Sequence, residues 1–182
     1  MLSYSSGPSA LPLLGETIGE NLRRTAARFG DRPALVACAQ GYRATYAELW
    51  ERTGLLARAL LARGVARGDR VGLWSPNRYE WVLLQYALAR VGAVLVNLNP
   101  AYKTAELEYA LNQSGASLLF LARAFRQSDY VAMLGEVRDR CPRLQGALVL
   151  DEVFPAILDE GAAVPEAELS AREASLQADD AI

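Results

Sequence analysis

The sequence predicts an α/β fold with a mostly parallel sheet flanked by helices. The first observation behind this prediction is a set of short apolar runs, such as Val71–Trp74 and Ala93–Val96, bounded by glycine or proline. Runs of this length and setting are typical of buried strands. The second observation is that longer segments with apolar residues at helical spacing separate these runs. Strands that alternate with helices in this way form parallel sheets.

The segment from Arg67 to Pro100 is one complete β-α-β unit, and the remaining elements are arranged around it. Ser75-Pro76-Asn77 follows its first strand. We expect Asn77 to cap the helix that comes next, with Glu80 three residues later as its partner in a capping box. Apolar residues cover more than one side of this helix, which predicts broad burial, and Gly92 is expected to end it.

Two further capping boxes mark helices earlier in the chain, at Thr17–Glu20 and at Thr45–Glu48. The apolar stripe of the first helix is predicted to contain Ile18, Leu22, Thr25 and Phe29. That of the second helix is predicted to contain Leu49, Thr53, Leu56 and Leu60. Between these helices, residues 34–38 and 42–45 are expected to form two short strands joined by a turn.

Helices and strands continue to alternate after the central unit. Thr104 and Ser128 are each expected to cap a helix. Two further buried strands are predicted, over residues 117–121 and 147–150. The sheet is therefore expected to extend beyond the central unit.

We expect three segments in the chain. Residues 1–16 form an N-terminal extension, and residues 17–150 form the α/β subdomain. Periodicity fades from Asp151, so residues 151–182 are expected to be a loop with one short helix. Asp179–Ile182 then has the pattern of a strand about to begin. Because a natural domain rarely ends on a new element, this pattern indicates a truncated domain.

Composition excludes several classes of protein. A net charge of −2, without blocks of like charge, gives no reason to expect nucleic acid or an acidic membrane as partner. No stretch approaches the ~20 apolar residues of a membrane helix, and Met1–Ser9 lacks the features of a secretory signal. Cys38 and Cys141 have no close spacing, so we expect two buried thiols and a reducing, cytoplasmic location. The absence of histidine rules out a Ser/His/Asp triad or histidine-bound zinc within the chain.

The sequence contains no glycine-rich phosphate motif and no cluster of metal-ligand residues. Its single lysine, Lys103, is expected to be a solvated turn residue beside a helix start. Glu106 and Glu108 are two apart on a predicted helix, so they should point to different sides as surface charges. None of these residues predicts a catalytic centre.

The best candidates for a ligand site follow the strands, because ligands of open parallel sheets bind beyond the carboxyl ends of the strands. These stretches are Ser75-Pro76-Asn77, Asn97-Leu98-Asn99-Pro100 and Ala122-Arg123. We favour a structural interpretation, in which Asn77 caps a helix while Asn97 and Asn99 satisfy backbone groups of a turn. The larger aromatic side chains are likewise expected in the core: Trp74, Trp81 and Tyr86.

Three stretches resemble the amino-terminal part of the adenylate-forming superfamily, in particular the fatty-acyl-CoA synthetases, also called AMP-binding ligases. Thr45–Leu49 and the helix after it are similar to the first core motif of that family. Gly68–Trp81 is similar to the next strand and helix, and Ala89–Pro100 to the second core motif. The Asn-Pro ending of that motif is typical of acyl-CoA synthetases. The resemblance covers residues 12–182.

The resemblance implies an enzyme that activates a fatty acid, of medium chain length, as an acyl-adenylate and then transfers it to coenzyme A. ATP, Mg²⁺ and coenzyme A would serve the full-length enzyme. The phosphate-gripping loop of the family would follow Ile182, and the later nucleotide-binding segments and carboxy-terminal domain are missing too. We therefore expect the chain alone to be inactive, and we assign it no catalytic, cofactor-binding or metal-binding residue.

A second interpretation remains open. The chain could be a stand-alone α/β binding or interaction subunit, completed by a partner chain. In either case a missing ligase segment or a second copy of the chain is expected to cover apolar faces that a partial sheet leaves exposed.

Overall fold

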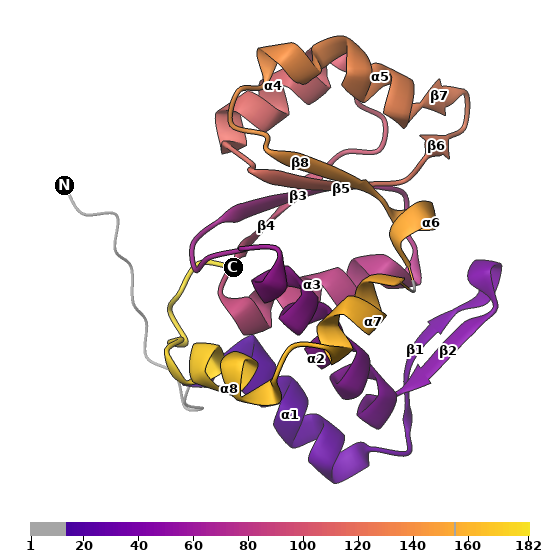
Figure 1. The fold of residues 1–182 in the computed structure, drawn as a ribbon. Coiled ribbons are helices and arrows are strands. Elements are labelled where there is room, and N and C mark those ends of the chain that lie inside the picture. The colour runs from indigo at the N-terminus through magenta and orange to yellow at the C-terminus, as the bar shows by residue number, and fades with distance from the viewer. Residues whose placement is uncertain (1–13, 155) are drawn as a thin grey trace, which may run out of the picture.

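Four parallel strands form the central sheet of the computed structural model, which describes residues 14–154 and 156–182 (Figure 1). Their order is β4-β3-β5-β8. Their bounds are β3 Arg70–Trp74, β4 Val94–Leu98, β5 Leu118–Leu121 and β8 Gly146–Val149. The predicted parallel sheet is thus confirmed, whereas the predicted extension over residues 1–16 lies almost entirely outside the described residues.

Helices cover both faces of this sheet (Figure 1). On one face lie α4 Thr104–Ser114 and α5 Tyr130–Val137. On the other lie α1 Ile18–Phe29, α2 Tyr46–Ala62, α3 Tyr79–Val91, α7 Ala156–Ala162 and α8 Glu166–Ala174. Each face has its own core, because alternate strand residues point to opposite sides. Leu73 therefore packs with α2 and α3, while its neighbour Trp74 packs with α4 and α5.

Three smaller pieces complete the fold. β1 Pro33–Ala37 and β2 Tyr42–Thr45 form an antiparallel hairpin that lies apart from the central sheet. Its tip is the 3-10 turn η1 Cys38–Gln40, where Cys38 is exposed, so the prediction of a buried thiol is wrong there and right at Cys141. The remaining short elements are β6 Ala124–Phe125, β7 Ser128–Asp129, η2 Arg138–Arg140 and α6 Leu150–Val153.

The first two predicted helix caps are confirmed. Thr17 accepts a hydrogen bond from the Glu20 amide, 3.1 Å away, at the start of α1. Thr45 and Glu48 form a complete capping box at the start of α2. All four residues of the predicted α2 stripe are buried. In α1, however, Leu22 alone of the predicted stripe is buried, and Ile18 is 38% exposed. Gly19 and Ala26 take the other buried positions, Gly19 against the side chain of Arg90.

Three later caps are not at the predicted residues. α3 begins after Arg78 instead of Asn77, and its first amide, that of Tyr79, donates to the side chain of Gln40 at 2.8 Å. A side chain 39 residues away thus caps this helix. α4 begins after Lys103, so Thr104 is its first helical residue.

The third helix cap that differs from the prediction is that of α5, which was expected at Ser128. Asp129 caps this helix by accepting from the Ala132 amide at 3.0 Å. Ser128 pairs with Phe125 in the small β6–β7 hairpin, so its backbone is already committed to a strand. Its hydroxyl accepts from Lys103 at 2.8 Å.

The last part of the chain contains more helix than the sequence predicts. Where one short helix was expected over residues 151–182, α6 continues into this segment and α7 and α8 follow. Both α7 and α8 are short, and each buries a single large apolar side chain, Ile157 and Leu169, so their helical pattern is weak. Contacts with α2 and α3 hold them in place. Asp179 and Asp180 lie in a turn rather than a strand, with the Gln177 amide donating to the Asp180 carboxylate at 2.9 Å.

None of the helices in residues 14–154 and 156–182 combines the length and apolar character needed to cross a bilayer.

Candidate functional site

The carboxyl ends of the central strands meet at one edge of the sheet, as the sequence predicts. Trp74, the last residue of β3, is in register with Leu98 of β4 and with Leu121 of β5. The loops that follow these strands therefore start at the same level. In open parallel sheets this edge is where ligands bind, so it is the first candidate site.

Arg78 is at the centre of this edge. Its guanidinium donates to the Glu80 carboxylate at 3.0 and 2.7 Å, and to the Asp151 carboxylate at 3.0 and 2.9 Å. The side chain of Arg78 is only 13% exposed and that of Glu80 only 4%. Gln40 adds a further donor to Glu80, at 2.9 Å. The network joins the hairpin tip, the start of α3 and the start of α6.

The network keeps its members charged. Burial alone would raise the pKa of Glu80, but hydrogen bonds from Arg78 and Gln40 outweigh this effect and lower it. The hydrogen bond from Arg78 lowers the pKa of Asp151. Hydrogen bonding to Glu80 in turn raises the pKa of the Arg78 guanidinium. A carboxylate held in its ionised form by arginine is poorly suited to act as a general acid or base near neutral pH.

On the other face of the sheet, the same edge is closed by stacked aromatic side chains. The rings of Trp74 and Tyr130 are parallel within 9°, with centroids 3.6 Å apart. The Trp74 indole donates to the Asn99 carbonyl at 3.1 Å, and the Tyr130 hydroxyl donates to the Pro100 carbonyl. Burial raises the pKa of Tyr130 to about 12. These rings are core residues that hold the turn after β4 in place.

Three of the remaining candidate residues at this edge also have structural contacts. The Asn99 side chain accepts from the Ala101 amide at 2.9 Å, as predicted for a turn residue. Ser75 is fully buried and donates to the Pro76 carbonyl at 2.8 Å. Asn77 and Asn97 are exposed, so of the two asparagines expected to satisfy the turn after β4, Asn99 alone does so among the described contacts. Arg123 forms an ion pair with Glu152.

The carboxylates expected on the surface of α4 do lie apart. Glu106 accepts from the Lys103 amide at 2.7 Å, whereas Glu108 forms an ion pair with Arg140 at 2.9 Å. Within the described residues, no group of three or more potential ligands is placed to hold a metal ion. The arrangement at the carboxyl edge therefore positions loops, and in the described part of the chain no nucleophile at this edge is paired with a base.

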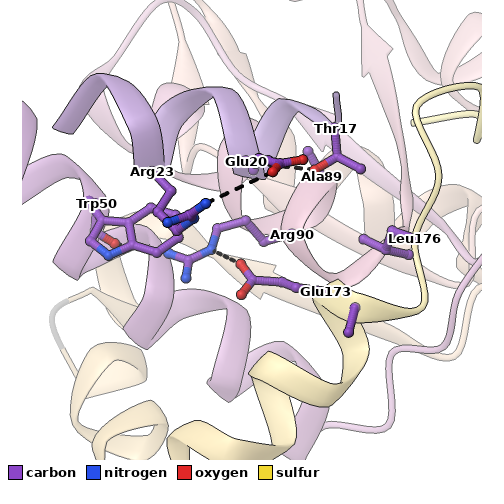
Figure 2. A pocket seen from close by; sticks show the side chains of 10 residues that line it. Thr17, Glu20, Arg23, Trp50, Ala89, Arg90, Glu173 and Leu176 are labelled. Atoms are coloured by element: carbon purple, nitrogen blue, oxygen red, sulfur yellow. Dashed lines mark hydrogen bonds and ion pairs between the residues drawn. The ribbon is translucent and has the colours of Figure 1, made fainter. Parts of the chain in front are cut away.

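A second candidate site is a cavity of about 340 Å³ between α1, α3 and α8 (Figure 2). Arg90 of α3 and Glu173 of α8 meet in it, with 2.6 Å between Nε and the carboxylate. Neither residue is predicted from the sequence as a site residue. The sequence contains one indication that Arg90 is a buried charge, because it lies inside an otherwise apolar stretch, Leu88–Val91. Its partner is 83 residues further on, and no local pattern points to it.

Comparison with known proteins agrees with this architecture. The sequence model described as "AMP-binding enzyme" matches residues 22–182. The chain is 40% identical over 145 residues to the "Medium-chain acyl-CoA ligase ACSF2, mitochondrial" of Danio rerio, a match that covers 80% of this chain and 23% of that protein. The chain thus spans about a quarter of the length of the curated relatives it matches.

Solved structures show the same fold. A long-chain-fatty-acid-CoA ligase (FadD1) from Archaeoglobus fulgidus superposes with a TM-score of 0.75 at 26% identity, over 91% of this chain and 33% of that one. The N-terminal domain of FACL13 from Mycobacterium tuberculosis gives a TM-score of 0.71 at 25% identity, over 83% of this chain and 36% of that one.

Proposed function

Because this chain belongs to the AMP-binding enzyme family, we propose that it forms the amino-terminal subdomain of an acyl-CoA ligase. The observation that carries this proposal is the 40% identity to a medium-chain acyl-CoA ligase across 80% of the chain. The reaction would activate a medium-chain fatty acid with ATP as an acyl-adenylate and then form the thioester with coenzyme A.

The role of this chain in that reaction would be to shape the scaffold. The Arg78 network fixes the start of α3 and the start of α6, directly after β8, relative to each other. The Trp74–Tyr130 stack does the same for the turn after β4. Catalytic groups carried by other segments would then be placed against a rigid edge, and rigid support of this kind is what precise positioning requires.

The described residues do not fit a site for ATP or Mg²⁺. Phosphoryl chemistry needs backbone amides, cations and a metal ion arranged around the phosphates. At the carboxyl edge, the guanidinium of Arg78 is occupied by Glu80 and Asp151, and those carboxylates are committed to arginine. We therefore propose that the 182 residues do not adenylate an acid by themselves.

The test is the exchange of labelled pyrophosphate into ATP that depends on added octanoate. The purified 182-residue chain should give only the background measured without octanoate. Exchange that rises with octanoate concentration and persists through purification would contradict the proposal. The chain could be part of a longer ligase or a separate subunit completed by a partner. Sequencing the reading frame past the codon for Ile182 distinguishes these two possibilities. Further ligase segments there would support a single-chain enzyme, and a stop codon would favour a subunit completed by a partner.

A partner or a further ligase segment is proposed to cover the edges of the sheet. β4 and β8 are its outer strands, and Val94, Leu95 and Val96 of β4 are only partly buried. An edge strand offers unpaired backbone groups to another strand. Analytical ultracentrifugation of the purified chain tests the homo-oligomer form of this proposal, which requires a concentration-dependent species larger than the monomer.

We also propose a cytoplasmic location, supported by the two free cysteines. The name of the Danio rerio relative places that protein in mitochondria. Cell fractionation with compartment markers separates the two: recovery of the protein with mitochondrial matrix markers would contradict the proposal.

A further inference from the structure

The cavity between α1, α3 and α8 lies at the edge of the sheet opposite to the carboxyl ends of the strands. Arg90, on its wall, is two residues before Gly92, which ends α3. The Gly92 carbonyl accepts from the Gly68 amide at 2.8 Å, in the loop that leads into β3. The cavity is therefore at the amino ends of the strands, away from the edge where the ligase site is proposed. An inference about this cavity consequently does not depend on the proposed function.

Arg90 is a buried cation that is held in place before any ligand arrives. Only 4% of the residue is exposed. One terminal nitrogen donates to the Trp50 carbonyl at 2.9 Å and to the Thr53 hydroxyl at 3.2 Å. The guanidinium also lies 3.5 Å from the centre of the Trp50 ring. Its Nε–H donates to the carboxylate of Glu173 at 2.6 Å, and its second terminal nitrogen carries two further N–H donors.

Glu173 reaches this position from α8, which packs on the outside of α2 and α3. Its side chain is 27% exposed, so water and small solutes reach the carboxylate. Figure 2 shows the Arg90–Glu173 pair pointing into the cavity, with Glu20 and Arg23 of α1 on the far side. Glu173 is thus a carboxylate bound to Arg90 inside a cavity that has room for a second molecule.

The cavity wall selects the kind of molecule. Beside the guanidinium the lining is apolar, from Ala89, Ala174 and Leu176. Glu20 lies 3.9 Å from Arg23, and Glu173 is paired with Arg90, so the described lining has no excess positive charge that would favour a doubly charged anion over a singly charged one. A pocket of this size with an apolar wall and a few placed charged groups is typical of a small-ligand site.

We propose that this cavity binds a small monocarboxylate with a short apolar body, whose carboxylate replaces that of Glu173 on Arg90. The apolar body would lie along Ala89 and Leu176. Binding would release Glu173, and with it one of the contacts that hold α8 against α3. Occupancy of the cavity would therefore loosen α8, and removal of the Glu173 carboxylate would open the site to the ligand.

Competition between Glu173 and the ligand sets the expected affinities. Glu173 is attached to the protein, so it acts at a high effective concentration, in the millimolar range or above for groups joined by a short tether. Butyrate should therefore bind the unmodified chain weakly. In Glu173→Gln the competing charge is gone while the side-chain size is kept, and we expect butyrate to bind about tenfold more tightly.

The experiment follows the Arg90 Nε–H resonance of the ¹⁵N-labelled 182-residue chain, assigned by its loss in Arg90→Lys. Sodium butyrate is titrated at constant ionic strength, alongside butyramide, which has the same shape without charge, and sodium phosphate. Glu168→Gln is the matched control, because Glu168 is an exposed carboxylate on the same helix. Hydrogen exchange of the α8 amides in the unmodified chain, with and without butyrate, gives a readout that needs no variant to fold.

The proposal expects butyrate to shift the Arg90 resonance more than butyramide or phosphate does. It also expects tighter binding in Glu173→Gln than in Glu168→Gln, and faster exchange of α8 when butyrate is present. If butyramide shifts the Arg90 resonance as much as butyrate does, the carboxylate does not contribute to binding and the proposal is overturned. Stronger binding of phosphate would overturn the ligand class. Absence of binding to both the unmodified chain and Glu173→Gln would overturn the site itself.

Discussion

Arg78 and Glu80, two residues apart at the start of α3, are joined by two hydrogen bonds of 3.0 and 2.7 Å. Residues at this separation in a helix do not face each other. The pair forms because Arg78 precedes the helix in an extended conformation, with φ −153° and ψ 162°, and its side chain folds back over the first turn. The Glu80 carboxylate, which the sequence assigned to a helix cap, is consequently the inner partner of an ion pair.

Loss of this pair should cost far more stability than loss of a surface pair. Arg78→Ala would leave the nearly buried Glu80 carboxylate without its charged partner, and we expect a loss of about 3 kcal/mol in the free energy of unfolding. Arg24→Ala is the control: it removes an ion pair with Glu16 whose arginine is 61% exposed, which should cost no more than about 1 kcal/mol. Urea denaturation followed by circular dichroism measures both, and equal losses would show that burial does not strengthen the Arg78–Glu80 pair.

The same pair predicts a dependence on pH. Because the pKa of Glu80 is lowered in the folded protein, its ionised form stabilises the fold above its unfolded pKa of about 4.3. This contribution is lost as the pH falls from that value through the lowered folded pKa. The stability difference between the unmodified chain and Glu80→Gln should therefore be largest near pH 6 and shrink towards pH 3. Urea midpoints at several pH values test this, and a difference that stays constant would contradict it.

The helix caps offer a matched pair of threonines. Thr45 accepts from the Glu48 amide at 3.2 Å at the start of α2, so Thr45→Ala should lower the free energy of unfolding by about 1 kcal/mol. Thr104 has no capping role, because α4 begins one residue earlier, after Lys103. Thr104→Ala should therefore change stability by less than about 0.5 kcal/mol. Thermal and urea unfolding of the two variants would rank them, and the opposite order would show that the helix starts are misplaced.

Docking of α7 on α2 depends on one glycine. A Cβ atom at Gly161 would lie 1.8 Å from the Leu55 carbonyl oxygen, and backbone atoms cannot move aside as a side-chain end can. Gly161→Ala should force α7 away from α2 and destabilise the chain by about 3 kcal/mol or more. Its control is Gly135→Ala in α5, where nothing lies within 4 Å of the added atom. That change should be neutral or stabilising by up to about 1 kcal/mol, since alanine favours helix.

Hydrogen exchange distinguishes displacement of α7 from general unfolding. In Gly161→Ala the amides of Ala156–Ala162 should exchange faster than those of the central strands. Uniformly faster exchange in every element would instead indicate that the whole fold depends on this contact. Unchanged exchange in α7 would contradict the close approach of the two helices.

The sequence determined the features that depend on neighbouring residues. Thr17 and Thr45 begin helices because their hydroxyls reach amides three residues away. Gly92 and Gly115 end helices because each adopts a positive φ, at 73° and 67°, that other residues rarely take. The alternation of apolar runs with helical stripes was sufficient to predict the parallel sheet. The order and spacing of the motifs were sufficient to predict the family.

Only the tertiary structure decided where charged side chains go and which elements meet. Gln40 caps α3 from 39 residues away, and Glu173 reaches Arg90 across 83 residues. The docking of α7 and α8 could not be predicted either, because each helix is short and buries only one large apolar side chain, and contacts with α2 and α3 fix its place. The physical reason is the sequence separation between the groups that interact: the backbone groups of caps and turns find hydrogen-bond partners within a few residues. The energy of a buried charge depends instead on what the fold brings beside it.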